Sequence, residues 1–319
     1  MRTVKRILCP IVLSPDSAEA LRYALTLART YDARLVLCHA VEGRTNGSRS
    51  ARANEPINET FAALIREHAQ GFALDGVRWE GIIVQGEPAE AITREAATHD
   101  VDLIVMCSRR RPHRAALLGS TAEAVARIAP CPVLVTHPQE REWISKTDGA
   151  INLRRVLVAY DFSDDAELAL RYALSLAEEY QAEIHLLHAL PKPVQDGPEI
   201  AWLPASTEGA YHQAARRLQK AVPADAHLRC RVVHSVRWGK PYRETLAYAA
   251  EHEIDLICMG AKGAGFGMSA LFGSNVDRVL RQAPCPTLVA RPLKPVTAQT
   301  QVAAREQSVN ASVVASRRS

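Results

Sequence analysis

The sequence predicts an α/β protein of two tandem units, each an open parallel sheet of five strands with helices on both faces. Residues 7–39 and 156–188 align without a gap and share the identical segment ALRYAL. Within each copy, short runs rich in β-branched residues alternate with longer segments of helical periodicity. This alternation implies right-handed crossovers and a parallel sheet that is covered on both faces.

The repeat extends to the end of each unit. VQGEPAEAITREAATHDVDLIVM in the first copy matches VRWGKPYRETLAYAAEHEIDLICM in the second, and APCPVLVTHP matches APCPTLVARP. Because the matched blocks follow in the same order, each copy is one complete fold unit. We predict a first domain at 1–138, a linker at 139–152, a second domain at 153–292 and a disordered tail without clear periodicity at 293–319.

The first unit shows the predicted elements in order. RILCPIV predicts the first strand. The side chains of Ser14 and Asp16 can accept hydrogen bonds from the unpaired N–H groups at the start of the next helix. Apolar residues at helical spacing from Ala20 to Ala28 predict that helix. Further strands are predicted at 33–41, 77–85, 101–106 and 132–137, and further helices at 59–73, 88–99 and 120–129.

The composition excludes several classes of protein. The 319 residues carry a net charge of only +4, which does not suggest a specific nucleic-acid binder. No apolar run approaches the roughly 20 residues needed to cross a bilayer, so we expect no membrane partner. The seven cysteines are odd in number and include no CxxC pair, which indicates reduced thiols in the cytoplasm.

A glycine-rich stretch follows the fourth strand of the second unit. Gly260 and Gly263 bracket a turn, and nine residues later Gly273 and Ser274 precede a helix. Glycines let the backbone approach a ligand closely and allow positive φ angles. The N–H groups at the helix start, with the Ser274 hydroxyl, can bind an anion, and Lys262 can add a positive charge. The stretch predicts a polyphosphate loop; the alternative is a surface loop whose glycines only permit turns.

The spacing from Gly260 to Ser274 resembles the nucleotide-binding pattern of the universal stress protein family, G-x2-G-x9-G-[ST]. The resemblance covers about residues 4–138 and 153–292. It implies a five-stranded parallel sheet with flanking helices, like that of the adenine nucleotide alpha hydrolases. It also implies a cytosolic stress-response protein with ATP, and Mg²⁺ or Mn²⁺, in its second domain.

The same resemblance implies further site residues. Nucleotide-binding members carry an aspartate at the end of the first strand, where this chain has Asp161, and a backbone segment that meets adenine, here His188 to Leu190. A carboxylate at that edge can accept hydrogen bonds from ribose hydroxyls, or can serve only as a favourable charge at a helix start. The complete predicted set is Asp161, Ala189, Met259, Gly260, Lys262, Gly263, Gly273, Ser274 and Asn275.

The first copy departs from this pattern. Val12 stands where Asp161 stands in the second copy, and Cys107 and Arg110 replace the first two glycines. Arg110 and Gly119 are separated by eight residues, one fewer than the pattern requires. We therefore predict that the first domain has lost the nucleotide site. Its basic cluster is either an anion site, or a solvated turn or interface element: Arg109, Arg110, Arg111, His113 and Arg114.

The predicted last strands, 132–137 and 286–291, would leave exposed edges if unpaired. We expect the two halves to dock on each other through them, and a homodimer of the whole chain is a further expectation. We predict a regulatory module that binds an adenine nucleotide and an unknown protein partner, with no catalytic residue and no metal ligand. The alternatives are a slow ATPase or phosphotransferase and a ligand-free scaffold.

Overall fold

The computed structural model describes residues 4–12, 17–41, 59, 61–63, 66, 76–108, 120–137, 141–192, 203–263 and 273–292. Four predictions fall wholly or mostly outside these ranges. They concern the tail at 293–319, the arginine cluster at 109–114, the helix at 59–73 and the helix-capping residues at 14–16.

Ten strands run through the described residues. Those of the first half are β1 (Arg6–Pro10), β2 (Arg34–Val41), β3 (Trp79–Gln85), β4 (Leu103–Cys107) and β5 (Val133–Thr136). Those of the second half are β6 (Arg155–Ala159), β7 (Glu183–Leu190), β8 (Val232–Trp238), β9 (Leu256–Gly260) and β10 (Thr287–Ala290). The five strands predicted along the first unit are therefore all observed, and the second half repeats them.

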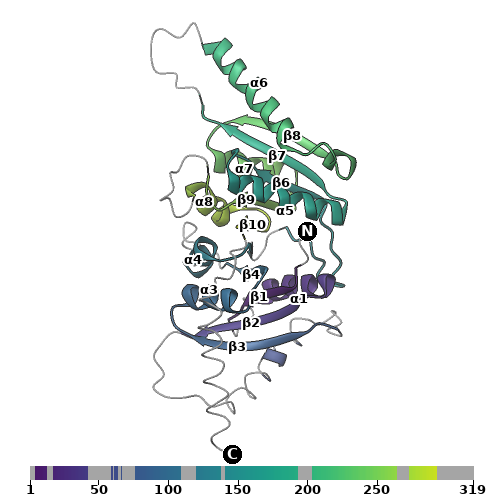
Figure 1. Cartoon of the computed structure of the whole chain (residues 1–319), viewed down its shortest axis with the longest axis vertical. Helices are drawn as coiled ribbons and strands as arrows, with labels where there is room; N and C mark the ends of the chain where they lie inside the picture. The colour runs from purple at the N-terminus through teal and green to yellow at the C-terminus, as the bar shows by residue number, and fades with distance from the viewer. Residues whose placement is uncertain are drawn as a thin grey trace, which may run out of the picture.

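All ten strands belong to one sheet, in the order β3-β2-β1-β4-β5-β10-β9-β6-β7-β8 (Figure 1). Neighbours are parallel except β5 and β10, which pair antiparallel with Leu134 opposite Leu288. The predicted α/β class with a mostly parallel sheet is confirmed, but the two predicted sheets are joined edge to edge. The physical reason is that each last strand satisfies the open N–H and C=O groups of the other.

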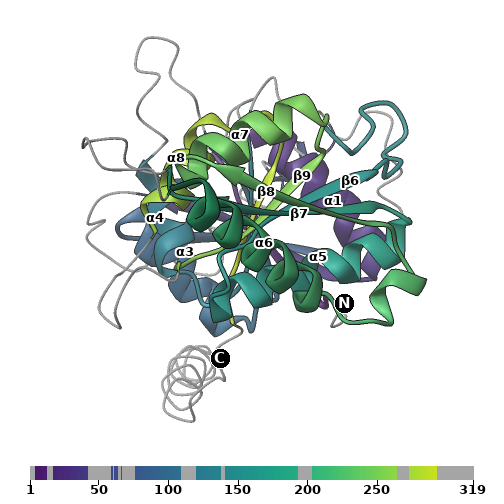
Figure 2. The same ribbon diagram turned by 90° about the horizontal axis from the view of Figure 1, so that it is seen from above.

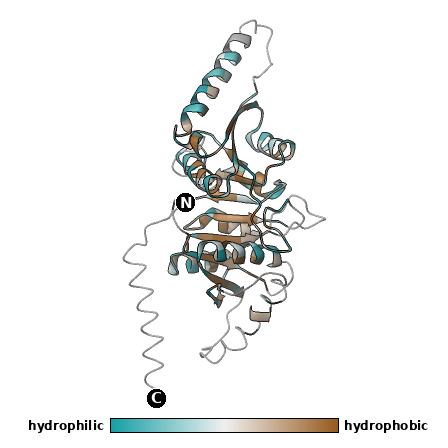
Figure 3. Ribbon diagram, turned by 90° about the vertical axis from the view of Figure 1, so that its right-hand side faces the viewer, coloured by the Kyte–Doolittle hydropathy of each residue, from teal (hydrophilic) through white to brown (hydrophobic). Residues whose placement is uncertain are grey.

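Helices cover both faces of this sheet (Figure 2). One face is packed by α1 (Ala18–Tyr31), α5 (Asp164–Tyr180) and α6 (Leu203–Ala221), with a short 3₁₀ turn at Ala226–Leu228. The other face is packed by α3 (Pro88–Thr98), α4 (Ser120–Ile128), α7 (Pro241–Glu251) and α8 (Ser274–Gln282). The central strands are apolar on both sides, as a doubly covered parallel sheet requires (Figure 3).

The predicted linker is packed into the protein. Trp143 is 2% exposed, and its ring meets the ring of Tyr23 edge to face at 5.0 Å. The backbone N–H of Trp143 donates to the Tyr23 hydroxyl at 3.1 Å, and beside it Arg22 forms an ion pair with Glu142. The N–H of Arg141 donates to the carbonyl of Pro284 in the second half. The segment therefore connects α1 with the start of β10.

Two arginines of the second half reach across to α4 of the first. Arg281 in α8 pairs with Glu123 at 2.8 Å. Arg291, which follows β10, donates through Nε to the carbonyl of Ala126 at 3.0 Å and through Nη1 to that of Ala129 at 3.3 Å. A guanidinium here satisfies carbonyls that the last turn of a helix leaves without partners. Polar contacts between the halves therefore supplement the paired strands and the apolar clusters that both halves share.

Several smaller predictions are tested by the fold. All seven cysteines are free thiols, and Cys131 and Cys285, in the equivalent APCP segments of the two copies, are buried. His39 and His188 occupy equivalent strand ends, where each ring Nδ1 lies within hydrogen-bond distance of a backbone carbonyl of the neighbouring strand segment. Within the described ranges, every helix is too short or too polar to cross a membrane.

Candidate functional site

A cavity of about 350 Å³ lies at the carboxyl ends of β6, β7 and β9. The chain runs from β6 outward to β7 and β8, then returns to β9 on the other side of β6. Such a reversal of strand order is where open α/β sheets bind ligands. Eight of the nine predicted residues line this cavity: Asp161, Ala189, Met259, Gly260, Lys262, Gly263, Gly273 and Asn275.

Ser274, the ninth predicted residue, is the first residue of α8 and is not among the lining residues. Its neighbour Gly273 is the N-cap and offers no side chain to the helix start. The backbone N–H groups of the first turn therefore lie beside the cavity without side-chain capping by Gly273. They carry the positive end of the helix dipole, which favours an anion at this edge.

The other walls of the cavity were not predicted from the sequence, apart from His188. They are mostly apolar and come from strand ends and first helical turns: Ala159, Tyr160, Ala166, Leu187, Pro191, Pro241, Thr245 and Val276. The available signal was topological, because every residue that directly follows a strand of a parallel sheet lies at the same edge. Pro241, at the start of α7 after β8, is the clearest example.

Asp161 is held in a local hydrogen-bonded turn. Its Oδ1 accepts from the backbone N–H of Ser163 at 3.1 Å and from the Ser163 hydroxyl at 2.6 Å. Ser163 is the N-cap of α5, and its Oγ accepts from the N–H of Ala166 at 3.2 Å. Asp161 thus lines the cavity and also supports the start of α5, which combines the two alternatives that the sequence left open.

Close packing explains two of the three glycines. A Cβ atom on Gly260 would lie 2.6 Å from the backbone carbon of Asp165, and one on Gly263 would lie 2.6 Å from Oδ2 of Asp161. At Gly273 the nearest contact would be an ordinary 3.4 Å to Val276. None of the three has a positive φ. The glycines are needed because backbone and carboxylate approach closely, not for a left-handed turn.

The turn after β9 is fixed to the first turn of α5. The backbone N–H of Lys262 donates to Oδ2 of Asp165 at 2.9 Å, while the Lys262 side chain is exposed at the cavity. Tyr160, which also lines the cavity, donates its hydroxyl to Glu167 at 2.7 Å. Burial, and then the bond to Glu167, raise the pKa of Tyr160, so its hydroxyl stays protonated well above neutral pH.

The equivalent edge of the first half lacks the acidic group. Val12 follows β1 at the position of Asp161 and is 46% exposed, with its N–H donating to the hydroxyl of Ser17. Cys107 ends β4 at the position of Gly260. Arg110 and Gly119 lie outside the described residues. The loss of a nucleotide site in this half stays a prediction, and Val12 is the observation that supports it.

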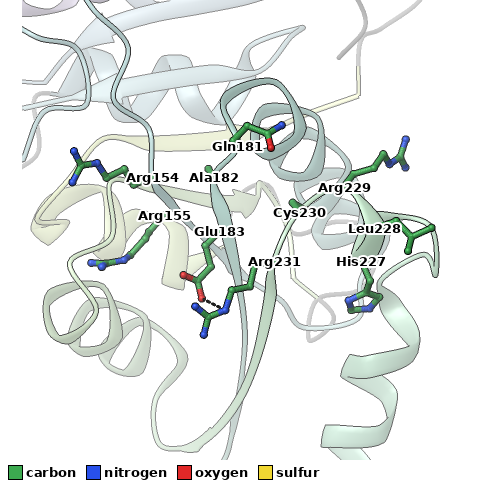
Figure 4. A pocket seen from close by; sticks show the side chains of 10 residues that line it. All are labelled: Arg154, Arg155, Gln181, Ala182, Glu183, His227, Leu228, Arg229, Cys230 and Arg231. Carbon is green, nitrogen blue, oxygen red and sulfur yellow. Dashed lines mark ion pairs between the residues drawn. The ribbon is translucent and has the colours of Figure 1, made fainter.

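A second hollow, of about 750 Å³, lies at the amino ends of β6, β7 and β8 (Figure 4). Three of its arginines are already paired with carboxylates: Arg231 with Glu183 at 3.3 Å, Arg229 with Asp225 at 2.6 Å, and Arg155 with Glu253 at 3.3 Å. The guanidinium groups of Arg154 and Arg229 point to opposite sides in Figure 4. Because three of its four arginines are already paired and the guanidinium groups are spread apart, we place the candidate site at the first cavity.

The fold and the cavity together define a tandem α/β protein with a candidate ligand site in its second half. The profile of the universal stress protein family matches residues 3–137 and again 152–291, so the chain belongs to this family as a two-domain member.

Relatives and a solved structure agree with this assignment. Universal stress protein Rv2623 of Mycobacterium tuberculosis is 30% identical over 296 residues, which cover 87% of this chain and 93% of the relative. A universal stress protein of Thermus aquaticus is 34% identical over 143 residues, 43% of this chain and 98% of its own. The crystal structure of a universal stress protein from Archaeoglobus fulgidus covers 90% of this chain and 96% of its own, at 25% identity and a TM-score of 0.60.

Proposed function

We propose that the second half binds ATP and that the protein acts in the stress response as a nucleotide-dependent binding module. The observation that carries the proposal is the gathering of eight predicted nucleotide residues around one cavity at the switch point of the sheet. Its volume lies at the lower end of the roughly 300–1,000 Å³ typical of small-molecule sites. Binding would favour one conformation of the Gly263 turn and so change the affinity for a protein partner.

The residues suit the three parts of the nucleotide differently. The apolar side of the cavity, with Leu187 and Met259, suits the adenine ring. Asp161 offers the carboxylate that ribose hydroxyls can donate to. The start of α8 and the Lys262 ammonium supply positive charge for the phosphates. The proposed site therefore offers apolar side chains to the adenine, a carboxylate to the ribose and positive charge to the phosphates.

We expect Mg²⁺ or Mn²⁺ to arrive with the triphosphate. Within the described residues, no group of three or more His, Cys, Asp or Glu side chains could hold a metal ion. Magnesium commonly binds through substrate phosphates, waters and one or two carboxylates, so a dedicated protein cage is not required. The ion would neutralise phosphate charge in this site.

We favour a binding role over catalysis. Phosphoryl transfer needs a group that orients the attacking nucleophile near the γ-phosphate. Asp161 is the single acidic side chain among the described lining residues, and Ser163 already occupies its Oδ1. A slow ATPase would need Asp161 both to bind the ribose and to orient the attacking nucleophile at the γ-phosphate. One carboxylate cannot do both, because the ribose and the γ-phosphate lie at different ends of the ligand.

Location and assembly complete the proposal. A cytoplasmic location agrees with seven free thiols, which reducing compartments preserve. A homodimer of the full chain stays a prediction, to be checked by light scattering.

Calorimetry of ATP binding to the full chain tests the proposal. Asp161→Asn removes the charge that strengthens hydrogen bonds to ribose, so affinity should fall about tenfold. Asp164→Asn is the matched control, because Asp164 begins the same helix α5, is exposed and does not line the cavity. Absence of ATP binding to the unaltered protein, or equal effects of the two substitutions, would contradict the proposal.

A further inference from the structure

We infer that Arg217 of α6 positions the Asp161 carboxylate by stacking on Phe162, and thereby sets the affinity of the site for the ribose. The inference rests on the proposed nucleotide function. Neither Phe162 nor Arg217 lines the cavity, so both would act through Asp161 rather than by touching the ligand.

The backbone at Phe162 has a conformation that side-chain residues rarely adopt. Its φ angle is +65°, in the left-handed region that glycine enters freely and bulky residues avoid. This one residue lies between Asp161 and Ser163, whose N–H reaches back to the Asp161 carboxylate at 3.1 Å. The turn that directs Asp161 to the cavity therefore depends on Phe162 being held in an unfavourable backbone conformation.

Three groups hold the Phe162 ring. Tyr160 meets it edge to face with ring centres 5.3 Å apart, and the imidazole of His188 lies at 4.6 Å. The guanidinium carbon of Arg217 lies 3.9 Å from the ring centre, well inside the range of a cation–π contact. Because Arg217 makes no ion pair within the described part of the chain, its charge is free to interact with this ring.

Two of the three groups around the Phe162 ring also line the cavity. Tyr160 and His188 both line it, and Nδ1 of His188 lies 2.8 Å from the carbonyl oxygen of Tyr160. The Phe162 ring therefore packs against two residues that line the cavity. A change at Arg217 removes the third contact of this ring and lets the Asp161 turn relax toward an ordinary backbone conformation.

A comparison of the two copies of the repeat supports a functional link between the Phe162 ring and the Asp161 carboxylate. In the alignment of the copies, Ile11, Val12 and Leu13 stand where Tyr160, Asp161 and Phe162 stand. His39 keeps the position of His188 and its contact with a strand-end carbonyl. The histidine thus occurs in both copies, whereas both aromatic rings occur only in the copy that has the carboxylate.

The experiment compares Arg217→Ala with Arg216→Ala in the full chain. Arg216 is exposed on the same helix, so it matches the change in charge and helix composition. Calorimetry measures the affinities of both variants for ATP and for 2′,3′-dideoxy-ATP, which lacks the ribose hydroxyls. Arg217 is itself exposed, so we expect Arg217→Ala to weaken ATP binding about two- to fivefold, in line with the strength of an exposed cation–π contact, and to leave the binding of dideoxy-ATP unchanged.

Two further variants separate positioning from a general loss of structure. Arg217→Lys keeps a cation over the ring and should retain most of the ATP affinity. Phe162→Leu keeps apolar bulk, removes the π face and should reproduce the ribose-specific loss.

The outcomes are distinguishable. Equal weakening of both nucleotides, or no difference between Arg217→Ala and Arg216→Ala, would overturn the inference while leaving ATP binding intact. A protein that binds neither nucleotide would refute the proposed function and this inference with it.

Discussion

Gly263 faces Asp161 so closely that a Cβ atom added to the glycine would lie 2.6 Å from the carboxylate oxygen Oδ2. The two residues come from different strand ends, β9 and β6, and meet at the mouth of the cavity. A side chain at position 263 would have to displace the group that we assign to the ribose. Position 263 therefore requires glycine because of its contact with Asp161, and not only because of the turn in which it lies.

The first prediction concerns Gly263→Ala. The added methyl group should push Asp161 aside and weaken ATP binding on the order of tenfold, equivalent to about 1.4 kcal/mol. Gly209→Ala in α6 is the control, because nothing lies within 4 Å of a Cβ atom there. The control should keep its ATP affinity and gain about 0.5–1 kcal/mol of stability from better helix propensity. Calorimetry showing unaltered ATP binding by Gly263→Ala would refute the assignment.

A second prediction separates stability from binding at Gly260. Its added Cβ would meet the backbone carbon of Asp165 at 2.6 Å and the N–H of Ala166 at 2.8 Å, and backbone yields less readily than a side chain. Gly260→Ala should lower the free energy of unfolding by about 1–3 kcal/mol, the usual effect of overpacking. Gly273→Ala, with ordinary contacts, should change it less. Urea unfolding gives both values, and equal losses would show that α5 does not pack on β9 as described.

The third prediction tests the seam between the halves. Arg291→Ala leaves the carbonyls at the end of α4 without their charged donor, so unfolding should become easier by about 1–3 kcal/mol. Arg171→Ala, at an exposed position of α5, provides the control for losing an arginine. Thermal unfolding of the full chain measures both. If the midpoints of the two variants coincide, Arg291 does not stabilise the contact between the halves.

The fourth prediction is a pH dependence centred on His185. Its ring is 6% exposed, its Nδ1 lies 2.9 Å from the Tyr248 hydroxyl, and burial lowers its pKa. The folded protein therefore resists a proton that the unfolded chain accepts near pH 6.5. The stability that neutral His185 contributes is fully present above that pH and is lost as the pH falls toward the lowered folded pKa.

His185→Phe should consequently flatten the decline of stability on the acid side of pH 6.5, whereas His212→Gln at an exposed position of α6 should not. Burial also lowers the pKa of His234, so a part of the decline should persist in the His185 variant. Denaturant titrations at a series of pH values measure the slopes. A slope that is identical with and without His185 would contradict the prediction.

Much of the site follows from local pattern. Strand ends and helix starts are visible as changes in hydrophobic periodicity, and in a parallel sheet they lie at one edge. Asp161, Gly263 and Gly273 could therefore be placed together although Asp161 and Gly273 lie 112 positions apart in the sequence. The apolar walls, such as Leu187 and Pro241, look like ordinary core or helix-start residues in the sequence. Whether such residues line the site depends on which of them the packing of the neighbouring strands and helices leaves uncovered.

The sequence alone determined the repeat, the succession of strands along the chain and the residues of the glycine pattern. Each of these depends only on residue types and their spacing along the chain. Three-dimensional packing decided the rest. It set the antiparallel register of β5 and β10, placed Asp165 where Gly260 must have no side chain, and brought Arg217 over Phe162. These contacts join segments that no periodicity links, and they form only when the hydrophobic faces of helices and sheet exclude water together.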